Sequence, residues 1–430
     1  MKKLLFVLYI GIIAITGCSD KGVEDGDYLV NEPVFMPADK FRSSVKCTSQ
    51  AVPISNYGKM CFYQGYMYIS ETEKGIHIID NRNPSHPRNA GFVELLGNAD
   101  LAIRNGKLYA DSFIDLLWFD ISNPVKPQQE GRLENVFKDA LPEGDNEYAY
   151  DSRYCYGYDG REGVIVGWKL KARSQAYMQE KGAWPTWRGG IGGGIRGDFL
   201  GISLAYNKSG SSVGVNGSMS RFALYEGYLY SVINNYMNII DLNGDKPVKA
   251  AEDIPVGIVE TIFSYRDNMF IGTPSGMMIY SVADPLKPEY MSSVWHAWGC
   301  DPVVVEDDIA YITIHSGSAC GQTNDDLIIY DVSNVKSPRH LVTYAMTNPK
   351  GLGIDSGTLF VCDDGLKIFN AKDPQTIMAN ELAHYTGMDG FDVIPFDNVL
   401  MMIADDGFYQ YDYSDLTKIR RLSKLPIVKK

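Results

Sequence analysis

The chain has 430 residues, of which 45% are hydrophobic and 22% are charged, a globular composition that excludes a chain disordered throughout. The formal net charge is −13, from 40 basic and 53 acidic residues, and no basic stripe is present, so no nucleic-acid partner is expected. Tyr and Gly are abundant, with 28 and 42 copies, which favours strands and turns over helices.

The first eighteen residues have the features of an export signal. Lys2 and Lys3 precede an apolar run at residues 4–15, which is shorter than the roughly 20 residues of a transmembrane helix. The run ends in Ile15-Thr16-Gly17-Cys18, which resembles the lipobox of bacterial lipoproteins, where the Cys is lipidated and becomes the mature N-terminus. An ordinary signal peptide beside an unrelated Cys is the alternative.

The polar and acidic residues 19–27 loosely resemble the surface-export signal of Bacteroidetes lipoproteins. We therefore expect residues 1–17 to be a signal peptide, Cys18 to carry the lipid, and residues 18–42 to be an acidic tether. The expected location is the outer membrane, with the membrane reached through the N-terminal lipid. Exposure at the cell surface or on the periplasmic side stays open.

We expect residues 43–430 to form one repeat domain. Past residue 58 one pattern recurs in it: a short aromatic strand, a turn, an apolar strand ending near Asp, and a turn that often contains Pro. In the clearest copy, residues 106–111 (GKLYAD) are followed by residues 116–124 (LLWFDISNP). The second-last residue of each apolar motif serves as a marker: Asp80, Asp120, Asp241, Ser281, Asp331, Asn370 and Asp412. These markers are 40, 121, 40, 50, 39 and 42 residues apart. A period near 40 with short strands is typical of β-propellers, which have four strands per blade.

These motifs and their order resemble the LVIVD-repeat family of bacterial propeller proteins. Residues 217–222, 260–263 and 300–305 further resemble its Bacteroidetes lipoprotein branch. The resemblance implies an all-β propeller at the cell envelope. It supplies no catalytic residues, because none is established for that branch.

The spacing of 121 contains an irregular insertion at residues 138–218. Residues 164–170 read as a strand without a following hairpin partner, and only residues 173–181 have a helix-compatible composition. We therefore expect a seven-bladed propeller rather than one with a degenerate eighth blade. If strands a to d run from the axis to the rim, the insertion, residues 295–300 and residues 315–326 all emerge on one face. We call this the decorated face, and loops on such a face often carry binding function.

Six Cys remain after Cys18. Cys300 and Cys320 fall on the decorated face of one expected blade, so we predict a disulfide between them. A second bond between Cys47 and Cys61 is possible but less strongly indicated, and Cys362 lies in a strand pattern and is expected to be a core thiol.

Charged residues precede or begin the expected inner strands and would surround the mouth of the central channel: Lys59, Asp100, Arg221, Glu260, Asp301, Lys350 and Asp392. They are candidate ligand-binding residues, together with Trp295 and Trp298 on the decorated face. The alternative is a purely structural one: a solvent-filled channel mouth accepts any ring of polar side chains, whether or not they bind a ligand. Trp184 and Trp187 are expected on the same face, either exposed or packed under their own loops.

No catalytic motif, metal site or cofactor is expected. His296 and His315 have no third ligand at a zinc-site spacing, and the glycines of residues 189–194 do not connect a strand to a helix as a phosphate loop does. The Asp-Asp-Gly sequences at 363–365 and 405–407 read as hairpin turns rather than metal ligands.

Two classes of function remain. The first is a non-enzymatic binding or scaffold module that presents its decorated face to an envelope protein or a glycan. The second is a glycan hydrolase or lyase that uses Asp100, Glu260, Asp301 or Asp392. The second requires two of these carboxylates to converge at a substrate site. A structural subunit of an envelope complex is a third idea, which an extended apolar patch would favour.

Overall fold

The computed structural model describes residues 27–137, 140–145, 147–155, 158–183, 185–186, 212–233, 235–251, 253–295, 302–315 and 324–428. Strands dominate this part of the chain, as the sequence predicts. Its α-helices are α1 (Ala38–Arg42) and α2 (Gln175–Lys181), and its 3-10 helices are η1 (Ser152–Tyr154) and η2 (Ile377–Asn380). In the described residues, no helix is long and apolar enough to cross a membrane.

Seven antiparallel sheets of the described chain each contain strands that follow one another in sequence. The first sheet consists of β3 (Met60–Tyr63), β4 (Tyr66–Glu71), β5 (Gly75–Asp80) and β6 (Arg88–Glu94). The second consists of β7 (Leu101–Arg104), β8 (Lys107–Ser112), β9 (Asp115–Asp120) and β10 (Gln128–Leu133). The third consists of β15 (Phe222–Tyr225), β16 (Tyr228–Ile233), β17 (Tyr236–Asp241) and β18 (Val248–Lys249), with β19 (Ile254–Pro255) beside β17.

The other four sheets are β20 (Thr261–Tyr265), β21 (Asn268–Thr273), β22 (Gly276–Ser281) and β23 (Glu289–Trp295); β24 (Val303–Glu306), β25 (Ile309–Ile314), β26 (Asp326–Asp331) and β27 (Arg339–Ala345); β28 (Leu352–Asp355), β29 (Thr358–Val361), β30 (Leu366–Asn370) and β31 (Glu381–Tyr385); and β32 (Gly390–Phe396), β33 (Val399–Ala404), β34 (Gly407–Asp412) and β35 (Arg420–Pro426). Short β2 (Lys46–Thr48) joins the outer edge of β6.

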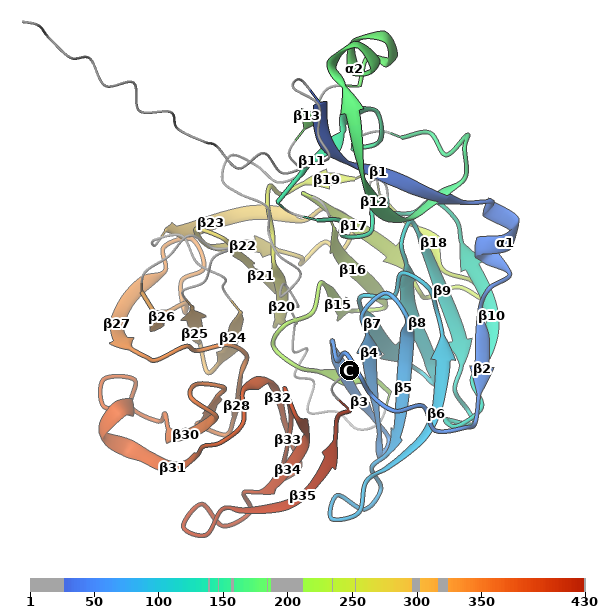
Figure 1. Cartoon of the computed structure of the whole chain (residues 1–430). Coiled ribbons are helices and arrows are strands. Elements are labelled where there is room, and N and C mark those ends of the chain that lie inside the picture. The colour runs from blue at the N-terminus through green and yellow to red at the C-terminus, as the bar shows by residue number, and fades with distance from the viewer. Residues whose placement is uncertain are drawn as a thin grey trace, which may run out of the picture.

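The sheets surround a common axis as a β-propeller, with the first strand of each sheet innermost (Figure 1). The inner strands contact one another in the order β3, β7, β15, β20, β24, β28 and β32. The ring closes through β14 (Val215–Asn216), which pairs with β3 and contacts β32. The first and last sheets are also joined by buried Asn81 and Gln410, whose side-chain amides exchange hydrogen bonds of 2.8 and 2.7 Å.

Packing between neighbouring sheets explains the apolar strands of the repeat. Every residue of β4 and of β5 is buried, because each sheet packs on both of its faces. Strands buried on both faces read as continuous apolar runs rather than as an alternating pattern. A single sheet of this kind leaves both faces exposed, so the repeats are stable only together.

The marker residue of each repeat begins a turn. In all seven copies its side-chain oxygen accepts a hydrogen bond from the backbone N–H two residues later, as Asp80 does from Arg82 and Asp331 does from Ser333. Such Asx and Ser turns stop the strand and reverse the chain. This requirement explains why Asp, Asn or Ser recurs at the marker position after an apolar run.

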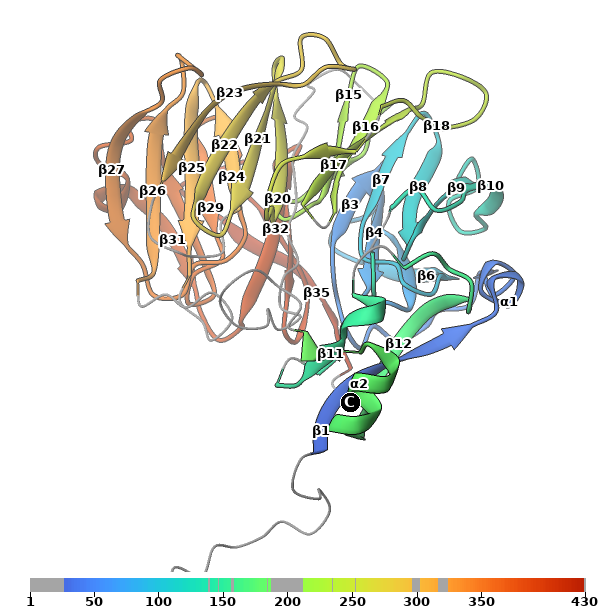
Figure 2. The same ribbon diagram turned by 90° about the horizontal axis from the view of Figure 1, so that it is seen from above.

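A further four-stranded sheet lies outside the ring, against one of its faces (Figure 2). It consists of β12 (Val164–Ser174), β1 (Asp27–Met36), β11 (Ala149–Asp151) and β13 (Pro185–Thr186). Phe41 and Val164 pack there against Phe113 in the β8–β9 turn. Turns of this kind belong to the decorated face, so the insertion covers that face as expected.

This sheet changes the interpretation of residues 27–42. The sequence predicts that they belong to a tether, whereas the structure places residues 27–36 in β1 and residues 38–42 in α1. β1 pairs with β12 over ten residues, from Asp27 with Ser174 to Met36 with Val164. The same pairing supplies the partner that residues 164–170 lack locally. Helix α2 confirms the helical composition noted at residues 173–181.

The described cysteines correct one expectation. Cys47 and Cys61 are free thiols, exposed and buried respectively, so the possible second disulfide between them is wrong. They cannot meet because Cys47 lies on the outer strand β2 and Cys61 on the inner strand β3 of the same sheet. Cys362 is buried in the core between β28–β31 and β32–β35, as expected. Cys300 and Cys320 lie outside the described residues, so their disulfide stays a prediction.

Candidate functional site

Residues 212–221, which we call the axial segment, occupy the centre of the ring. Arg104 of β7 pairs with Val213, and β14 pairs with Cys61 and Phe62 of β3. Across the ring, the N–H groups of Leu352 and Ile262 donate to Ser218 Oγ at 2.9 Å and to the Ser220 carbonyl at 3.1 Å. A segment that reaches β7, β20 and β28 at once lies on the axis. The central channel is therefore filled here by the chain itself.

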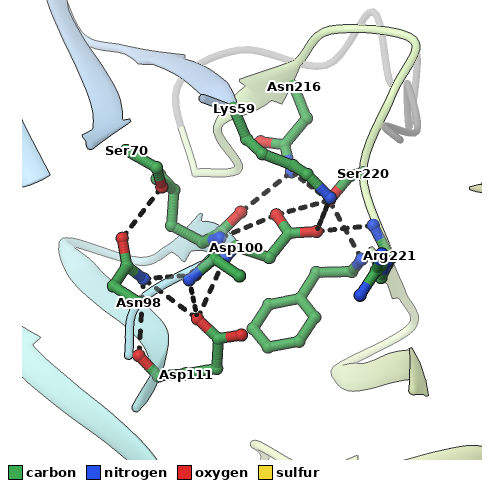
Figure 3. A network of polar contacts seen from close by, with 11 residues as sticks. Lys59, Ser70, Asn98, Asp100, Asp111, Asn216, Ser220 and Arg221 are labelled. Carbon is green, nitrogen blue, oxygen red and sulfur yellow. Dashed lines mark hydrogen bonds and ion pairs between the residues drawn. The ribbon is translucent and has the colours of Figure 1, made fainter. Parts of the chain in front are cut away.

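The carboxylate of Asp100, at the start of β7, holds this segment (Figure 3). Ser220 Oγ lies 2.8 and 2.9 Å from its two oxygens. The Arg221 N–H donates to Asp100 Oδ2 at 2.5 Å, and the Leu101 N–H donates to Oδ1 at 2.7 Å. Asp100 is 2% exposed, so these donors replace the water that a surface carboxylate would bind.

Asp392 of β32 holds the segment from the other side. Its Oδ1 accepts from the Ser218 N–H at 3.2 Å and from Ser218 Oγ at 3.0 Å, whereas its Oδ2 is buried with no hydrogen-bond partner among the residues that the structure describes. Burial raises the pKa of Asp392 to about 7, despite the hydrogen bonds from Ser218 and Val393. Gly217 makes this approach possible, because a Cβ there would lie 2.1 Å from Asp392 Oδ2.

A second buried carboxylate, Asp111 of β8, lies beside Asp100 (Figure 3). Its Oδ1 accepts from the N–H groups of Ala99 and Asp100 at 2.7 and 2.9 Å, and from Asn98 Nδ2 at 3.0 Å. Ser70 Oγ in turn donates to Asn98 Oδ1 at 2.9 Å. Burial nevertheless raises the pKa of Asp111 to about 7. This carboxyl group therefore changes its charge near neutral pH.

Lys59, just before β3, supplies a buried cation. Its Nζ lies 3.5 Å from Asp100 Oδ2, and the side chains of both residues are 2% exposed. Burial lowers the pKa of Lys59 to about 8, although the charge of Asp100 opposes the shift. Strongly shifted groups of this kind gather at functional sites, but they also occur in structural networks.

A cavity of about 100 Å³ opens beside this network on the decorated face. Its polar lining includes Lys59, Asp100, Asp111 and Arg221, and the insertion contributes residues 140, 141 and 143. The remaining walls are Thr72, Glu73, Gly97, Ala99, Phe113, Phe222 and Ile233. Since the volume is small and the carboxylates are buried, the site is suited to a small molecule rather than to a glycan chain.

The structure brings together Lys59, Asp100 and Arg221 at this cavity, and Asp392 is close enough for the charge of Lys59 to oppose the rise of its pKa. Glu260 is buried before β20, whereas Lys350 forms an ion pair of 2.7 Å with Asp389. Trp295, at the end of β23, is 76% exposed. Several other residues of the sequence analysis lie outside the described residues: Cys18, Trp184, Trp187, residues 189–194, His296, Trp298 and Asp301.

His315 is half-buried at the end of β25, and no group of three potential metal ligands occurs within the described ranges. Both Asp-Asp-Gly sequences lie at hairpins, between β29 and β30 and between β33 and β34. In the hairpin at residues 363–365, Asp364 and Gly365 have the left-handed backbone conformation of a tight turn.

Sequence reasoning missed Asp111, Ser218 and Ser220 as parts of the site. Asp111 stands inside a strand of the clearest repeat copy, where an acidic residue among apolar neighbours is a signal of a buried polar network. Ser218 and Ser220 belong to a stretch noted only for its family resemblance. Their partners lie 174 and 120 residues away, respectively, so no local pattern marks them.

Comparison with known proteins agrees with the fold and leaves the site unassigned. A model of the LVIVD repeat matches residues 60–94, which include β3 to β6. No curated protein matches the chain.

Among solved structures, a protein from Lactobacillus plantarum is similar, with a TM-score of 0.51 and 12% identity over 87% of this chain and 97% of that chain. Hsv2 of Kluyveromyces lactis has a TM-score of 0.47 and 11% identity, covering 87% of this chain and 99% of its own. BamB from Moraxella catarrhalis has a TM-score of 0.45 and 11% identity, covering 90% and 91%. At these identities the likeness concerns the fold alone.

Proposed function

We propose that this protein is a lipid-anchored, seven-bladed β-propeller of the cell envelope that binds a protein or glycan partner without catalysing a reaction. One observation carries the non-enzymatic part of the proposal. The channel-mouth carboxylates Asp100 and Asp392 are buried and hydrogen-bonded to Ser220 and Ser218 of the axial segment. A glycosidase instead needs two carboxylates that face the sugar from opposite sides of the scissile bond.

The decorated face is the proposed partner surface. The added sheet builds this face outward from the ring, and exposed Trp295 lies at its edge, because its partner Gly276 follows the β21–β22 turn. An exposed Trp offers a large, rigid apolar area with one hydrogen-bond donor, which suits both protein and sugar partners. Tyr290, 52% exposed, lies toward the other end of the same strand and provides a matched comparison.

The partner is tested with a soluble form starting after Cys18, applied to a glycan array and used for crosslinking in its native envelope fraction. Trp295→Ala is expected to reduce the captured signal, whereas Tyr290→Ala is expected to preserve it. Both variants must keep the wild-type midpoint of thermal unfolding. Equal loss in the two variants, or wild-type capture by Trp295→Ala, would exclude the decorated face as the partner surface.

The anchor is tested separately on the full-length chain. The proposal places the lipid on Cys18, at the end of an apolar run of lipoprotein type. Metabolic labelling with a fatty-acid analogue is expected to tag the wild-type protein and to leave Cys18→Ser unlabelled and absent from the outer-membrane fraction. Labelling that persists in Cys18→Ser would refute this assignment without affecting the partner experiment.

A further inference from the structure

The buried ammonium group of Lys59 has unused hydrogen-bond donors. Within the described part of the chain, its hydrogen-bonding contact is Asp100 Oδ2 at 3.5 Å. An ammonium carries three donors, and a charged group removed from water requires partners for them. Asp100 is already occupied by the Ser220 hydroxyl and by the backbone N–H groups of Leu101 and Arg221. Lys59 therefore keeps donors for another acceptor, and it lines the cavity.

Asp111 offers an unused acceptor to the same cavity. Its Oδ1 accepts from the N–H groups of Ala99 and Asp100 and from Asn98 Nδ2, whereas its Oδ2 has no hydrogen-bond partner among the described residues (Figure 3). Asp111 is 6% exposed and lines the cavity. Because buried polar groups in proteins are nearly always hydrogen-bonded, an acceptor left over beside a cavity indicates a donor that the cavity receives.

Lys59 and Asp111 do not satisfy each other. In the described residues the ion pair of Lys59 is with Asp100, and none joins it to Asp111. The two are nevertheless neighbours, because burial lowers the pKa of Lys59 and the charge of Asp111 opposes that shift. A ligand that bridges them must accept from Lys59 and donate to Asp111. A primary carboxamide does both, since its carbonyl oxygen and its NH₂ group point in different directions.

The cavity limits the size of the ligand and sets its apolar part. Its volume is about 100 Å³, and an apolar cavity of roughly 150 Å³ holds a benzene ring, so about four or five non-hydrogen atoms fit. Phe113, Phe222 and Ile233 line it from the propeller, with Ala140 and Leu141 from the insertion. Apolar walls with a few polar groups are typical of a site for a small molecule.

The charges favour a neutral ligand. Four carboxylates and two cations belong to the described lining: Glu73, Asp100, Asp111 and Glu143, with Lys59 and Arg221. The excess of carboxylates opposes an anion. A cation would leave the unused donors of Lys59 without an acceptor and would be repelled by them. An uncharged group that both accepts and donates meets neither obstacle.

We propose that the cavity binds a small aliphatic primary amide. Its carbonyl oxygen accepts from Lys59, its NH₂ group donates to Asp111 Oδ2, and its alkyl end packs against the apolar walls. This site is separate from the partner surface around Trp295 and does not depend on the function proposed above.

The probe is propionamide, compared with two molecules of nearly the same shape. 2-Butanone carries a methyl group in place of the NH₂ group, so it keeps the acceptor and loses the donor. Propionate carries a charged oxygen there. Saturable propionamide binding is expected, with each comparison molecule weaker by about tenfold or more, since a hydrogen bond to a charged group is lost.

Binding is measured by calorimetry and by saturation-transfer NMR on the chain from Ser19 onward, which contains every described residue. The titrations are made at pH 8 and constant ionic strength. Burial raises the pKa of Asp111 to about 7, so its carboxylate is ionised and accepts at this pH. Lys59 donates whether or not its amine carries the extra proton.

Asp111→Asn reverses the polarity of one contact. The carbonyl oxygen of the new side chain can take over the bonds of Oδ1, which leaves its NH₂ group in place of Oδ2. Propionamide binding is expected to fall about tenfold, whereas 2-butanone is expected to bind at least as well as to the wild type. Lys59→Met is expected to weaken propionamide binding about tenfold. Lys350→Gln is the matched control, since Lys350 pairs with Asp389 away from the cavity lining.

Three outcomes would overturn the proposal. They are absence of saturable propionamide binding to the folded wild type, equal affinity for 2-butanone, and unchanged propionamide affinity in folded Asp111→Asn. The first would mean that the cavity holds water only. The comparison of ligands on the wild type keeps the decision clear if Lys59→Met fails to fold. None of these outcomes bears on partner capture, which is measured with Trp295→Ala.

Discussion

Ser220 Oγ lies 2.8 and 2.9 Å from the two carboxylate oxygens of Asp100, although the two residues are 120 positions apart. This contact joins the axial segment to the inner strand β7. Ser218 and Asp392 repeat the arrangement toward β32. Polar residues at the channel mouth thus stabilise the closure of the propeller.

Removing the Ser220 hydroxyl is expected to destabilise the fold. Ser220→Ala leaves the buried Asp100 carboxylate with fewer donors, which costs about 1.5–3 kcal/mol for a hydrogen bond to a charged group. The free energy of unfolding is measured by urea denaturation. Ser85→Ala, at an exposed turn, is the control and is expected to stay within about 0.5 kcal/mol of the wild type. Equal stability of Ser220→Ala and wild type would show that this contact contributes nothing.

A methyl group on Gly217 is expected to displace the axial segment. The Cβ of Gly217→Ala would lie 2.1 Å from Asp392 Oδ2, inside van der Waals contact, and overpacking of this kind costs about 1–3 kcal/mol. Gly167→Ala in β12 is the control, because its Cβ meets nothing within 4 Å. Hydrogen exchange at Ser218 and Leu352 should accelerate in the first variant alone. Unchanged exchange there would contradict the tight approach.

The raised pKa of Asp392 predicts that the free energy of unfolding depends on pH. Its pKa is about 7 in the fold and near its ordinary value of 3.8 in the unfolded chain. Between these values the native state holds a proton that the unfolded state has released, so the stability contribution falls as pH rises from about 4 to about 7. A difference of one in pKa corresponds to about 1.4 kcal/mol.

The comparison variant for this effect is Asp392→Asn, which cannot ionise. The stability of the wild type relative to this variant is expected to decrease across that window and to level off above it. Urea denaturation at pH 4.5, 6 and 7.5 measures the difference and cancels the titration of all other groups. If the stability of the wild type relative to Asp392→Asn stayed constant from pH 4.5 to 7.5, Asp392 would be ionised in the fold throughout this range, and the prediction would be wrong.

Three of the described thiols, those of Cys47, Cys61 and Cys362, should differ in reactivity. Cys47 is exposed, whereas burial raises the pKa of Cys61 and Cys362 well above the usual range, so few thiolates form at these two sites. Native alkylation followed by peptide mapping is expected to label Cys47 first and the other two only after unfolding. Labelling Cys61 as fast as Cys47 would show that β3 opens readily. The same map, without reductant, reveals whether the Cys300 and Cys320 peptides are joined.

The sequence alone determined the repeat, the strands and the turns, because these follow from local spacing. A period near 40 indicates four short strands, and an Asp at the marker position is explained by a hydrogen bond to a backbone N–H two residues away. The residues around the channel mouth could also be selected, since each inner strand has a fixed place within its repeat.

Only the tertiary structure decided what those residues contact. The partners of Asp100 and Asp392 lie 120 and 174 residues away, and β1 pairs with a strand more than a hundred residues later. Such pairings depend on how the whole ring closes around the axial segment, and local patterns carry no record of them. The shifted pKa values of Lys59, Asp111 and Asp392 have the same origin, because burial is created only when the sheets meet.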